Sequence, residues 1–158
     1  MKFVIQRVNF AEVKVDGKTV GKIGKGLLVL CGITTEDDEA VAAKMVKKLC
    51  ALRIFDDADG KTNLSAPDVG GRLLIVSQFT LCADASHGNR PSFIGAARPE
   101  KAEPLYEFIL AEAEKLIPGV ERGIFGADMK VTLENDGPFT VILDSNEIFP
   151  KKWQETGR

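Results

Sequence analysis

The segment Asn135-Asp136-Gly137-Pro138-Phe139-Thr140 lies between two strand-like runs near the end of the chain, residues 129–134 and 139–143. Asp-Gly between two such runs is typical of a tight hairpin turn, because the favoured turns need positive φ angles. Here Pro138 follows at once, and proline gives no N–H to a sheet and favours a cis peptide more than other residues do. Two interpretations stay open: a hairpin turn whose proline starts an edge strand, or a rigid backbone device that presents two carbonyl oxygens to a ligand.

The chain before this segment is rich in predicted strands. Apolar and polar residues alternate over residues 2–8 and 11–15, which indicates strands with one buried face. Two runs, 27–33 and 72–76, are almost continuously apolar, as expected of strands covered on both faces. Further strands are predicted at 19–23, 52–55, 120–125, 129–134 and 139–143, and an irregular loop at 61–71.

Two stretches have helical periodicity. The first ends near residue 52, and Thr35 with Asp38 resembles a capping box at its start. The second spans residues 100–117, with Pro104 in or near its first turn and a buried stripe of Leu105, Phe108, Ile109 and Leu116. We therefore expect an α/β fold: a single β-rich domain with curved mixed sheets forming a barrel-like core and two main helices packed on it.

Composition limits the kinds of protein this can be. The 158 residues are 44% hydrophobic and 28% charged, which predicts one globular domain over residues 1–145 with a polar tail over 146–158. No apolar run is long enough to span a membrane, and charge interrupts the first residues too soon for a signal peptide. Three scattered cysteines indicate reduced thiols, and hence a cytoplasmic protein. A net charge of −2 argues against binding nucleic acid by a global field, so no DNA partner is expected.

Familiar catalytic motifs are absent from the sequence. It contains no HExxH, GxSxG, P-loop or GxGxxG pattern. Metal ligands are too sparse for a site, so we expect neither a metal nor a cofactor. Ser77, His87 and Asp84 could form a triad only if the fold brought them together. Cys82 is more typical of a core thiol than of a nucleophile.

The segment Ser77-Gln78-Phe79-Thr80 is unusual because a buried strand ends there in polar side chains around one aromatic residue. Successive backbone N–H groups at such a strand end could point at one ligand atom and form an oxyanion hole. The alternative is structural: the hydroxyl groups bond a neighbouring loop, and Phe79 lies in the core.

These two segments together resemble the signature motifs of the D-aminoacyl-tRNA deacylases. The resemblance covers residues 1–145 and departs from the family pattern at Phe139, where a small aliphatic residue is usual. The other matching segments are Arg7-Val8, Val15-Asp16-Gly17, residues 24–28, residues 52–55, Arg90-Pro91-Ser92-Phe93, residues 125–129 and Leu143-Asp144-Ser145.

The resemblance implies an enzyme that hydrolyses the ester between a D-amino acid, or glycine, and the tRNA 3′ end, and that spares L-aminoacyl-tRNA. It implies a homodimer in which Gly137 and Pro138 of one subunit enter the pocket of the other. With a cis peptide bond between them, both carbonyls would hold the substrate's α-amino group, and an L side chain would collide with this wall. Arg7 would steady the motif; otherwise it is a charge on a strand face.

The resemblance also assigns catalysis to the backbone N–H groups of Gln78, Phe79 and Thr80, with the ribose 2′-hydroxyl assisting water. Ser77 and Met129 join Gly137, Pro138 and Arg7 as substrate-binding residues in this assignment. One alternative is an esterase with Thr80 as nucleophile, and another is a module that binds tRNA acceptor ends without cleaving them. Three lysines on the first helix meet either phosphates or only solvent: Lys44, Lys47 and Lys48.

Overall fold

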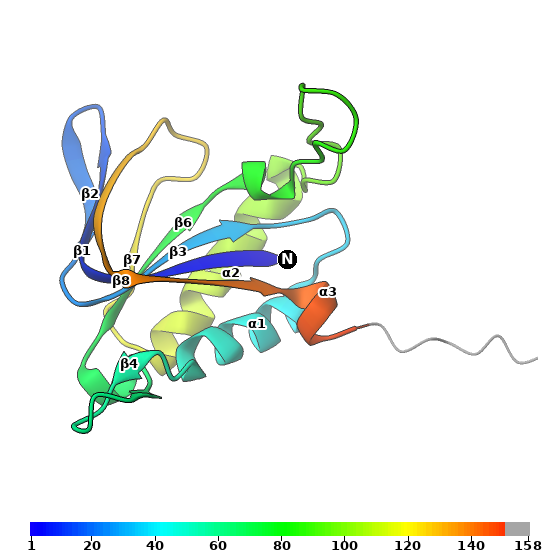
Figure 1. The fold of residues 1–158 in the computed structure, drawn as a ribbon. Coiled ribbons are helices and arrows are strands. Elements are labelled where there is room, and N and C mark those ends of the chain that lie inside the picture. Colours follow the sequence, from blue (N-terminus) through cyan, green and yellow to red (C-terminus); the bar gives the residue numbers. More distant parts are fainter. Residues whose placement is uncertain (151–158) are drawn as a thin grey trace, which may run out of the picture.

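The strand β1 (Lys2–Val15) is the centre of the sheet, because three other strands pair with it, all antiparallel (Figure 1). On one side its first half pairs with β3 (Gly26–Gly32) and its second half with β2 (Lys18–Ile23). On the other side β8 (Lys130–Asp144) pairs along almost its whole length. The computed structural model describes residues 1–150 of the chain.

The sheet continues from β3 through two parallel pairings, first with β6 (Arg72–Ser77) and then with the short β7 (Glu121–Arg122). It then curls back on itself, so that β7 comes close to β2. Gly21 makes this approach possible, since a Cβ atom there would collide with the carbonyl oxygen of Arg122. The sheet is therefore mixed and curved like a nearly closed barrel, as the sequence predicts.

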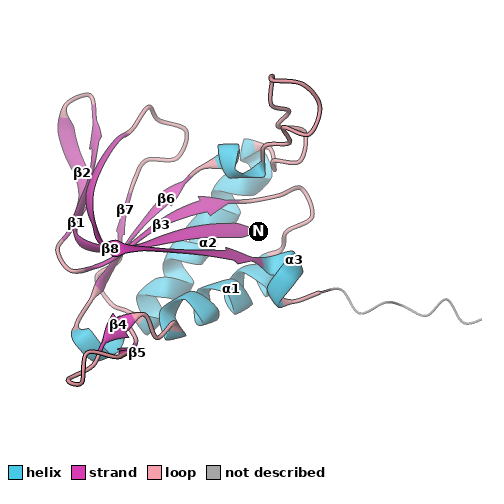
Figure 2. Ribbon diagram, viewed as in Figure 1, coloured by secondary structure: helices cyan, strands magenta, loops and turns pink. Residues whose placement is uncertain are grey.

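Two long helices cover one face of the sheet (Figure 2). They are α1 (Glu39–Ala51) and α2 (Pro99–Leu116), which pack against each other. The prediction of two main helices is confirmed. Pro99 is the first residue of α2, where a missing N–H costs little, while Pro104 lies inside the helix.

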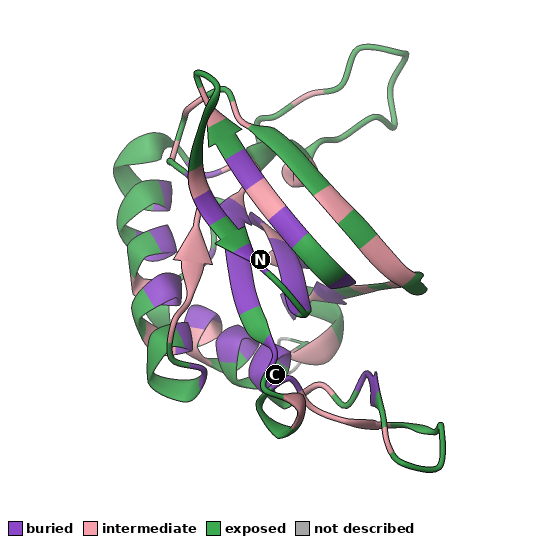
Figure 3. Cartoon of the chain, turned by 90° about the vertical axis from the view of Figure 1, so that its left-hand side faces the viewer, coloured by how far each residue is buried: buried purple, intermediate pink, exposed green. Residues whose placement is uncertain are grey.

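The core has two parts because β3 and β6 are buried on both faces. Leu27, Val29 and Ile75 face the helices together with Tyr106, Ile109 and their neighbours. On the opposite face, inside the curl of the sheet, lies a smaller cluster of Val8, Ala11, Val13, Ile23, Leu28, Leu74 and Val76. Figure 3 shows how buried and exposed residues alternate along the outer strands. The prediction that the apolar runs are doubly covered strands is confirmed.

Of the two interpretations of Asp136–Pro138, the hairpin turn is wrong. Residues 130–144 form one strand, and both halves of it pair with β1, from Lys14↔Lys130 to Lys2↔Asp144. The Gly137–Pro138 peptide bond is cis and lies in the middle of this strand. The register shifts between Gln6 and Phe10, where β8 bends across β1 instead of reversing. The chain therefore stays on one partner through a segment whose composition is that of a turn.

Smaller differences from the sequence predictions have local causes. The residue that caps α1 is Asp38, whose carboxylate accepts from the Val41 N–H, so Thr35 is not the cap. Leu116 is 48% exposed and leaves the buried stripe of α2. Only Glu121–Arg122 of the predicted strand 120–125 is a strand. The region 52–71 contains the strands β4 (Phe55–Asp56) and β5 (Thr62–Leu64) and the short helix η1 (Pro67–Val69).

The predicted tail begins with structure. The helix α3 (Ser145–Ile148) follows β8 directly, and the Asp144 carboxylate accepts from the Asn146 N–H at its start. Ile148 and Phe149 pack against the core. Residues 151–158 of the predicted tail, including Trp153, lie outside the described residues.

Candidate active site

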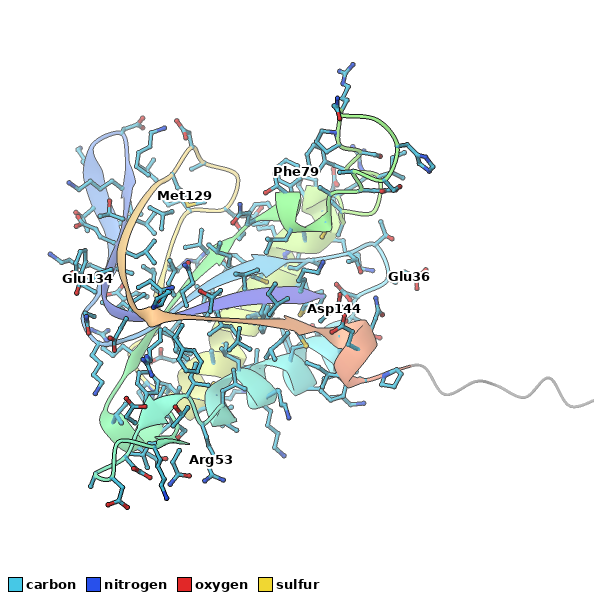
Figure 4. The ribbon with its side chains drawn as sticks, in the orientation of Figure 1. Glu36, Arg53, Phe79, Met129, Glu134 and Asp144 are labelled. Atoms are coloured by element: carbon cyan, nitrogen blue, oxygen red, sulfur yellow. The ribbon has the colours of Figure 1, made fainter. Side chains whose placement is uncertain are left out.

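A cleft of about 760 Å³ opens where β6 ends. The short helix η2 (Phe79–Cys82) forms one side of it, and the loop before β8 forms the other (Figure 4). Phe79 and Met129 approach the cleft from these two sides. Its remaining lining is mostly apolar and comes from Leu30, Cys31, Ile33, Val76, Ser77, Gln78, Thr80, Phe93, Ala96, Ala97, Pro99, Ala102, Phe125, Gly126, Ala127, Asp128 and Val131.

Five of the predicted site residues therefore meet in this cleft: Ser77, Gln78, Phe79, Thr80 and Met129. Phe79 is 60% exposed, so its predicted alternative place in the core is wrong. Its ring meets that of Phe93 edge to face, with centroids 5.2 Å apart. A large aromatic ring that is exposed beside a cavity suits contact with a ligand better than packing in the protein interior.

The backbone of this segment provides two available hydrogen-bond donors. The N–H of Gln78 already donates to the carbonyl of Cys31, which continues the β3–β6 pairing. Phe79 and Thr80 occupy the first turn of η2, where helical N–H groups have no partner within the helix. Within the described part of the chain no hydrogen bond occupies these two groups. The donors that an oxyanion could use are therefore those of Phe79 and Thr80.

Side chains in the cleft offer little nucleophilic chemistry. The Thr80 hydroxyl accepts from the Gln78 side-chain amide at 3.0 Å, and an amide cannot act as a base toward it. Burial raises the pKa of the Cys31 thiol, which lines the cleft, and of the Cys82 thiol, which does not, and both stay protonated at neutral pH. The Asp84 carboxylate accepts from the Ser86 N–H. In residues 1–150 nothing bonds Ser77, His87 and Asp84 to one another, so the triad does not form.

Gly137, Pro138 and Arg7 do not line this cleft and form a second cluster. Arg7 is 8% exposed, and its guanidinium donates from Nε to the carbonyl of Asp136 at 3.0 Å and from Nη1 to that of Ile54 at 2.9 Å. It also stacks on Phe139, 4.6 Å from the ring centroid. Gly137 and Pro138 themselves are exposed. The buried Arg7 thus contacts the chain on both sides of the exposed Gly137-Pro138 dipeptide, at Asp136 and at Phe139.

Asn135 braces the same segment, although the sequence assigns it no role. Its side-chain oxygen accepts from the Phe139 N–H at 2.6 Å, and its amide nitrogen donates to the Thr140 hydroxyl at 3.0 Å. Phe93, Phe125 and Asp128 of the cleft also have no predicted role. Their only signal in the sequence is that they fall within the matching segments, which says nothing of where their side chains lie.

The lysines of α1 lie away from the cleft. Lys44, Lys47 and Lys48 border a shallow groove of about 300 Å³ beside Phe149.

Among residues 1–150 no three His, Cys, Asp or Glu side chains are grouped as metal ligands. No helix in that part of the chain is both long and apolar enough to cross a membrane.

Comparison with known proteins fits this geometry. Residues 4–144 match the family of D-Tyr-tRNA(Tyr) deacylases. The chain is 56% identical to the D-aminoacyl-tRNA deacylase of Lactobacillus helveticus over 144 residues, 91% of this chain and 99% of that one. It is 54% identical to the deacylase of Thermosipho melanesiensis, over 94% of this chain and all of that one.

Solved structures share the fold. One described as a c-Myc DNA unwinding element binding protein superposes with a TM-score of 0.87 at 41% identity, covering 91% of this chain and 98% of that chain. A probable eukaryotic D-amino acid tRNA deacylase superposes with a TM-score of 0.79 at 16% identity, covering 90% and 97% of the two chains. The curved mixed sheet with its two helices is thus a fold that both solved structures share. This chain belongs to the D-aminoacyl-tRNA deacylase family.

Proposed function

We propose that this protein hydrolyses the ester bond of D-aminoacyl-tRNA, releasing tRNA and the D-amino acid as a proofreading step in translation. One observation carries the proposal: the Ser77–Thr80 segment and Met129 line a single cleft in a chain 52–57% identical to such deacylases. The mostly apolar lining suits an amino-acid side chain and a nucleobase. Glycine, which has no side chain to exclude, is accepted as well.

Catalysis in this proposal depends on the backbone. The N–H groups of Phe79 and Thr80 stabilise the oxyanion that forms when water attacks the ester carbonyl. The ribose 2′-hydroxyl beside the ester assists that water, and the one carboxylate that lines the cleft, Asp128, is 84% exposed and pairs with Lys130 at 3.2 Å. The rival mechanism, with Thr80 as nucleophile, lacks the base that would remove the proton of its hydroxyl.

In this proposal a second subunit distinguishes D-aminoacyl from L-aminoacyl substrates. Gly137 and Pro138 of one protomer enter the cleft of its partner, where their carbonyls accept from the substrate's α-ammonium group. An L side chain would then point into this backbone wall, while a D side chain points away from it. Supporting this proposal, the dipeptide is exposed and lies outside the cleft of its own chain. Arg7 and Asn135 hold it rigid from both sides.

The test compares D-tyrosyl-tRNA with L-tyrosyl-tRNA and measures the amino acid released. We expect rapid release from the D substrate and little from the L substrate. Equal release from both would contradict chiral proofreading, and binding without release would favour the acceptor-end binding module.

A Thr80→Ala variant separates the two catalytic mechanisms. It should stay within about tenfold of the wild-type rate, the scale of one lost hydrogen bond, whereas a nucleophile variant would lose hydrolysis while still binding substrate.

A further inference from the structure

An exposed apolar surface lies at one edge of the cleft, formed by Phe79, Phe93 and Ile94; we call it the Phe93 rim. The exposed fractions of these side chains are 60%, 37% and 88%. Phe79 and Phe93 also line the cleft itself, whereas Ile94 does not. Single exposed apolar residues are common, but two aromatic rings in edge-to-face contact at a cleft, with a third exposed apolar residue next to them in the chain, indicate a contact surface.

The Phe93 rim is held in place by the body of the protein. Asp84 and Ser92 exchange two backbone hydrogen bonds of 2.8 Å, which close the base of the loop that precedes the rim. Beyond it, the Thr35 N–H donates to the carbonyl of Gly95 at 3.1 Å, and the Ala97 N–H donates to that of Ile33 at 2.9 Å. The rim is thus attached to the end of β3, and a ligand that binds there need not first order a loop.

Two arginines flank the rim along the chain, although the whole chain is net negative. Arg90 precedes it in the loop, and Arg98 follows it with its side chain 85% exposed. The Lys101 ammonium group donates to the carbonyl of Thr35, the residue whose N–H bonds Gly95. Glu100 pairs with Arg98 at 3.7 Å in solvent, an arrangement that is weak and easily exchanged for another anion.

We propose that the Phe93 rim binds the bases of the unpaired nucleotides that precede the terminal nucleotide of the tRNA 3′ end, with Arg90 and Arg98 facing their phosphates. The inference rests on the proposed function, because the ester on the last nucleotide must lie in the cleft. The preceding nucleotides then leave through the mouth of the cleft, which the rim borders. Flat aromatic and apolar side chains beside cations suit single-stranded nucleic acid, since any base can stack on them.

The experiment compares D-tyrosyl esters of adenosine, of the trinucleotide CCA and of whole tRNA. With the wild-type protein, kcat/KM should rise by about tenfold or more from adenosine to the trinucleotide, as expected for stacked bases. Ile94→Ser should reduce that gain and leave the adenosine ester unaffected, because Ile94 does not line the cleft. Arg98→Gln should weaken the salt dependence of KM for the trinucleotide. Leu116→Ser serves as the control, because Leu116 is an aliphatic residue that is 48% exposed and lies at the far end of α2 from the rim; this change should leave all three rates as they are.

The outcomes separate this inference from the proposed function. If the wild-type protein does not hydrolyse D-tyrosyl-tRNA, the proposed function fails and this inference fails with it. If it hydrolyses all three esters with equal kcat/KM, only the rim is contradicted. Equal losses on adenosine and trinucleotide esters in Ile94→Ser would also overturn the rim. A change in the sedimentation coefficient of that variant would show instead that a second copy of the chain covers this surface.

Discussion

Phe79 makes two separable contributions at the residue scale. Its ring borders the cleft, and its N–H is one of the two donors available for an oxyanion. Alanine at this position would remove only the ring, whereas proline would remove both the ring and the N–H. The local backbone accepts proline well. Gln78 is extended, with φ −147° and ψ 92°, and a residue that precedes proline favours an extended backbone. Residue 79 is the first residue of η2, and proline is common at the first position of a helix.

We therefore expect Phe79→Pro to hydrolyse D-tyrosyl-tRNA about 10²–10³-fold more slowly than Phe79→Ala, the usual cost of one oxyanion donor. Single-turnover rates with saturating enzyme measure this difference without the contribution of binding. Urea unfolding of both variants provides the control for folding. Equal single-turnover rates in two equally stable variants would rule out the Phe79 N–H as a catalytic donor.

Gly137 has a backbone conformation that side chains rarely adopt. Its φ is +147°, and a Cβ atom there would lie 2.7 Å from the nitrogen of Phe139. That nitrogen donates to the side-chain oxygen of Asn135, so a shift of the chain would break this hydrogen bond. Gly137→Ala should cost about 1–3 kcal/mol locally and displace the two carbonyls proposed to hold the substrate.

The expected result for Gly137→Ala is a fall of at least about tenfold in the hydrolysis of D-tyrosyl-tRNA, corresponding to about 1.4 kcal/mol of lost binding or activation energy. Circular dichroism should show the wild-type fold. Gly24→Ala is the matched control, because a Cβ atom at Gly24 meets nothing within 4 Å. Normal activity in Gly137→Ala would mean that the carbonyls of this segment do not contact the substrate.

At the scale of elements, sequence patterns predict the strands and helices whose positions are determined by the burial of apolar side chains. The continuously apolar runs identify β3 and β6, and periodicity identifies α1 and α2 to within a few residues. The course of β8 could not be predicted in this way. Asp136-Gly137 has the composition of a turn, and only the pairing of both halves with β1 prevents the reversal. Long-range pairing thus overrides local preference at this one point.

The candidate site was predictable in parts. The motif resemblance identified the segment from Ser77 to Thr80, and the fold places all of it at one cleft. Spacing could not show that the Gln78 N–H is already bonded to Cys31, nor that Phe79 is exposed. Both facts depend on how β6 ends against β3, which is a property of three-dimensional packing and not of local sequence.

Tyr106 fixes α2 to the sheet beneath the cleft. It is fully buried, and its hydroxyl donates to the carbonyl of Ile75 in β6 at 2.6 Å. That carbonyl also accepts from the Gly123 N–H at 3.4 Å, so it keeps a partner when the hydroxyl is removed. Tyr106→Phe should therefore lower the free energy of unfolding by only about 1 kcal/mol, measured by urea denaturation. A loss above about 3 kcal/mol would mean that the carbonyl is left unsatisfied.

Glu114 connects the last turns of α2 to the turn that follows the helix, through hydrogen bonds to its backbone. Its carboxylate accepts from the N–H groups of Gly119 and Val120, which hold its pKa below the ordinary value of 4.5. A lowered folded-state pKa gives stability that is complete above pH 4.5 and is lost as the pH falls through the folded value. Glu114→Gln should therefore destabilise the protein most at neutral pH and progressively less in acid. Urea unfolding at several pH values tests this, and a difference that does not vary with pH would contradict it.

At the scale of the whole molecule, β8 is an open edge. It pairs with β1 on one side only, and no other strand of residues 1–150 covers its second side. Ile142 is 61% exposed and Val131 is 37% exposed along it. Long uncovered edges with apolar side chains favour association. A homodimer with the dipeptide of one subunit in the cleft of the other would use this part of the molecule, and mixing two variants can test it.

The two variants carry complementary defects. Gly137→Ala has an intact cleft and a defective dipeptide, whereas Phe79→Pro has a defective cleft and an intact dipeptide. If the dipeptide acts in the partner's cleft, a mixed dimer contains one site in which both parts are wild type. After unfolding and refolding together in equal amounts, half of the dimers are mixed, and each has one working site of two. The mixture should then recover about a quarter of the wild-type activity, measured with D-tyrosyl-tRNA, although each variant alone should have about a tenth of it or less. If both parts acted within one subunit, every site would contain a defect and mixing would restore nothing.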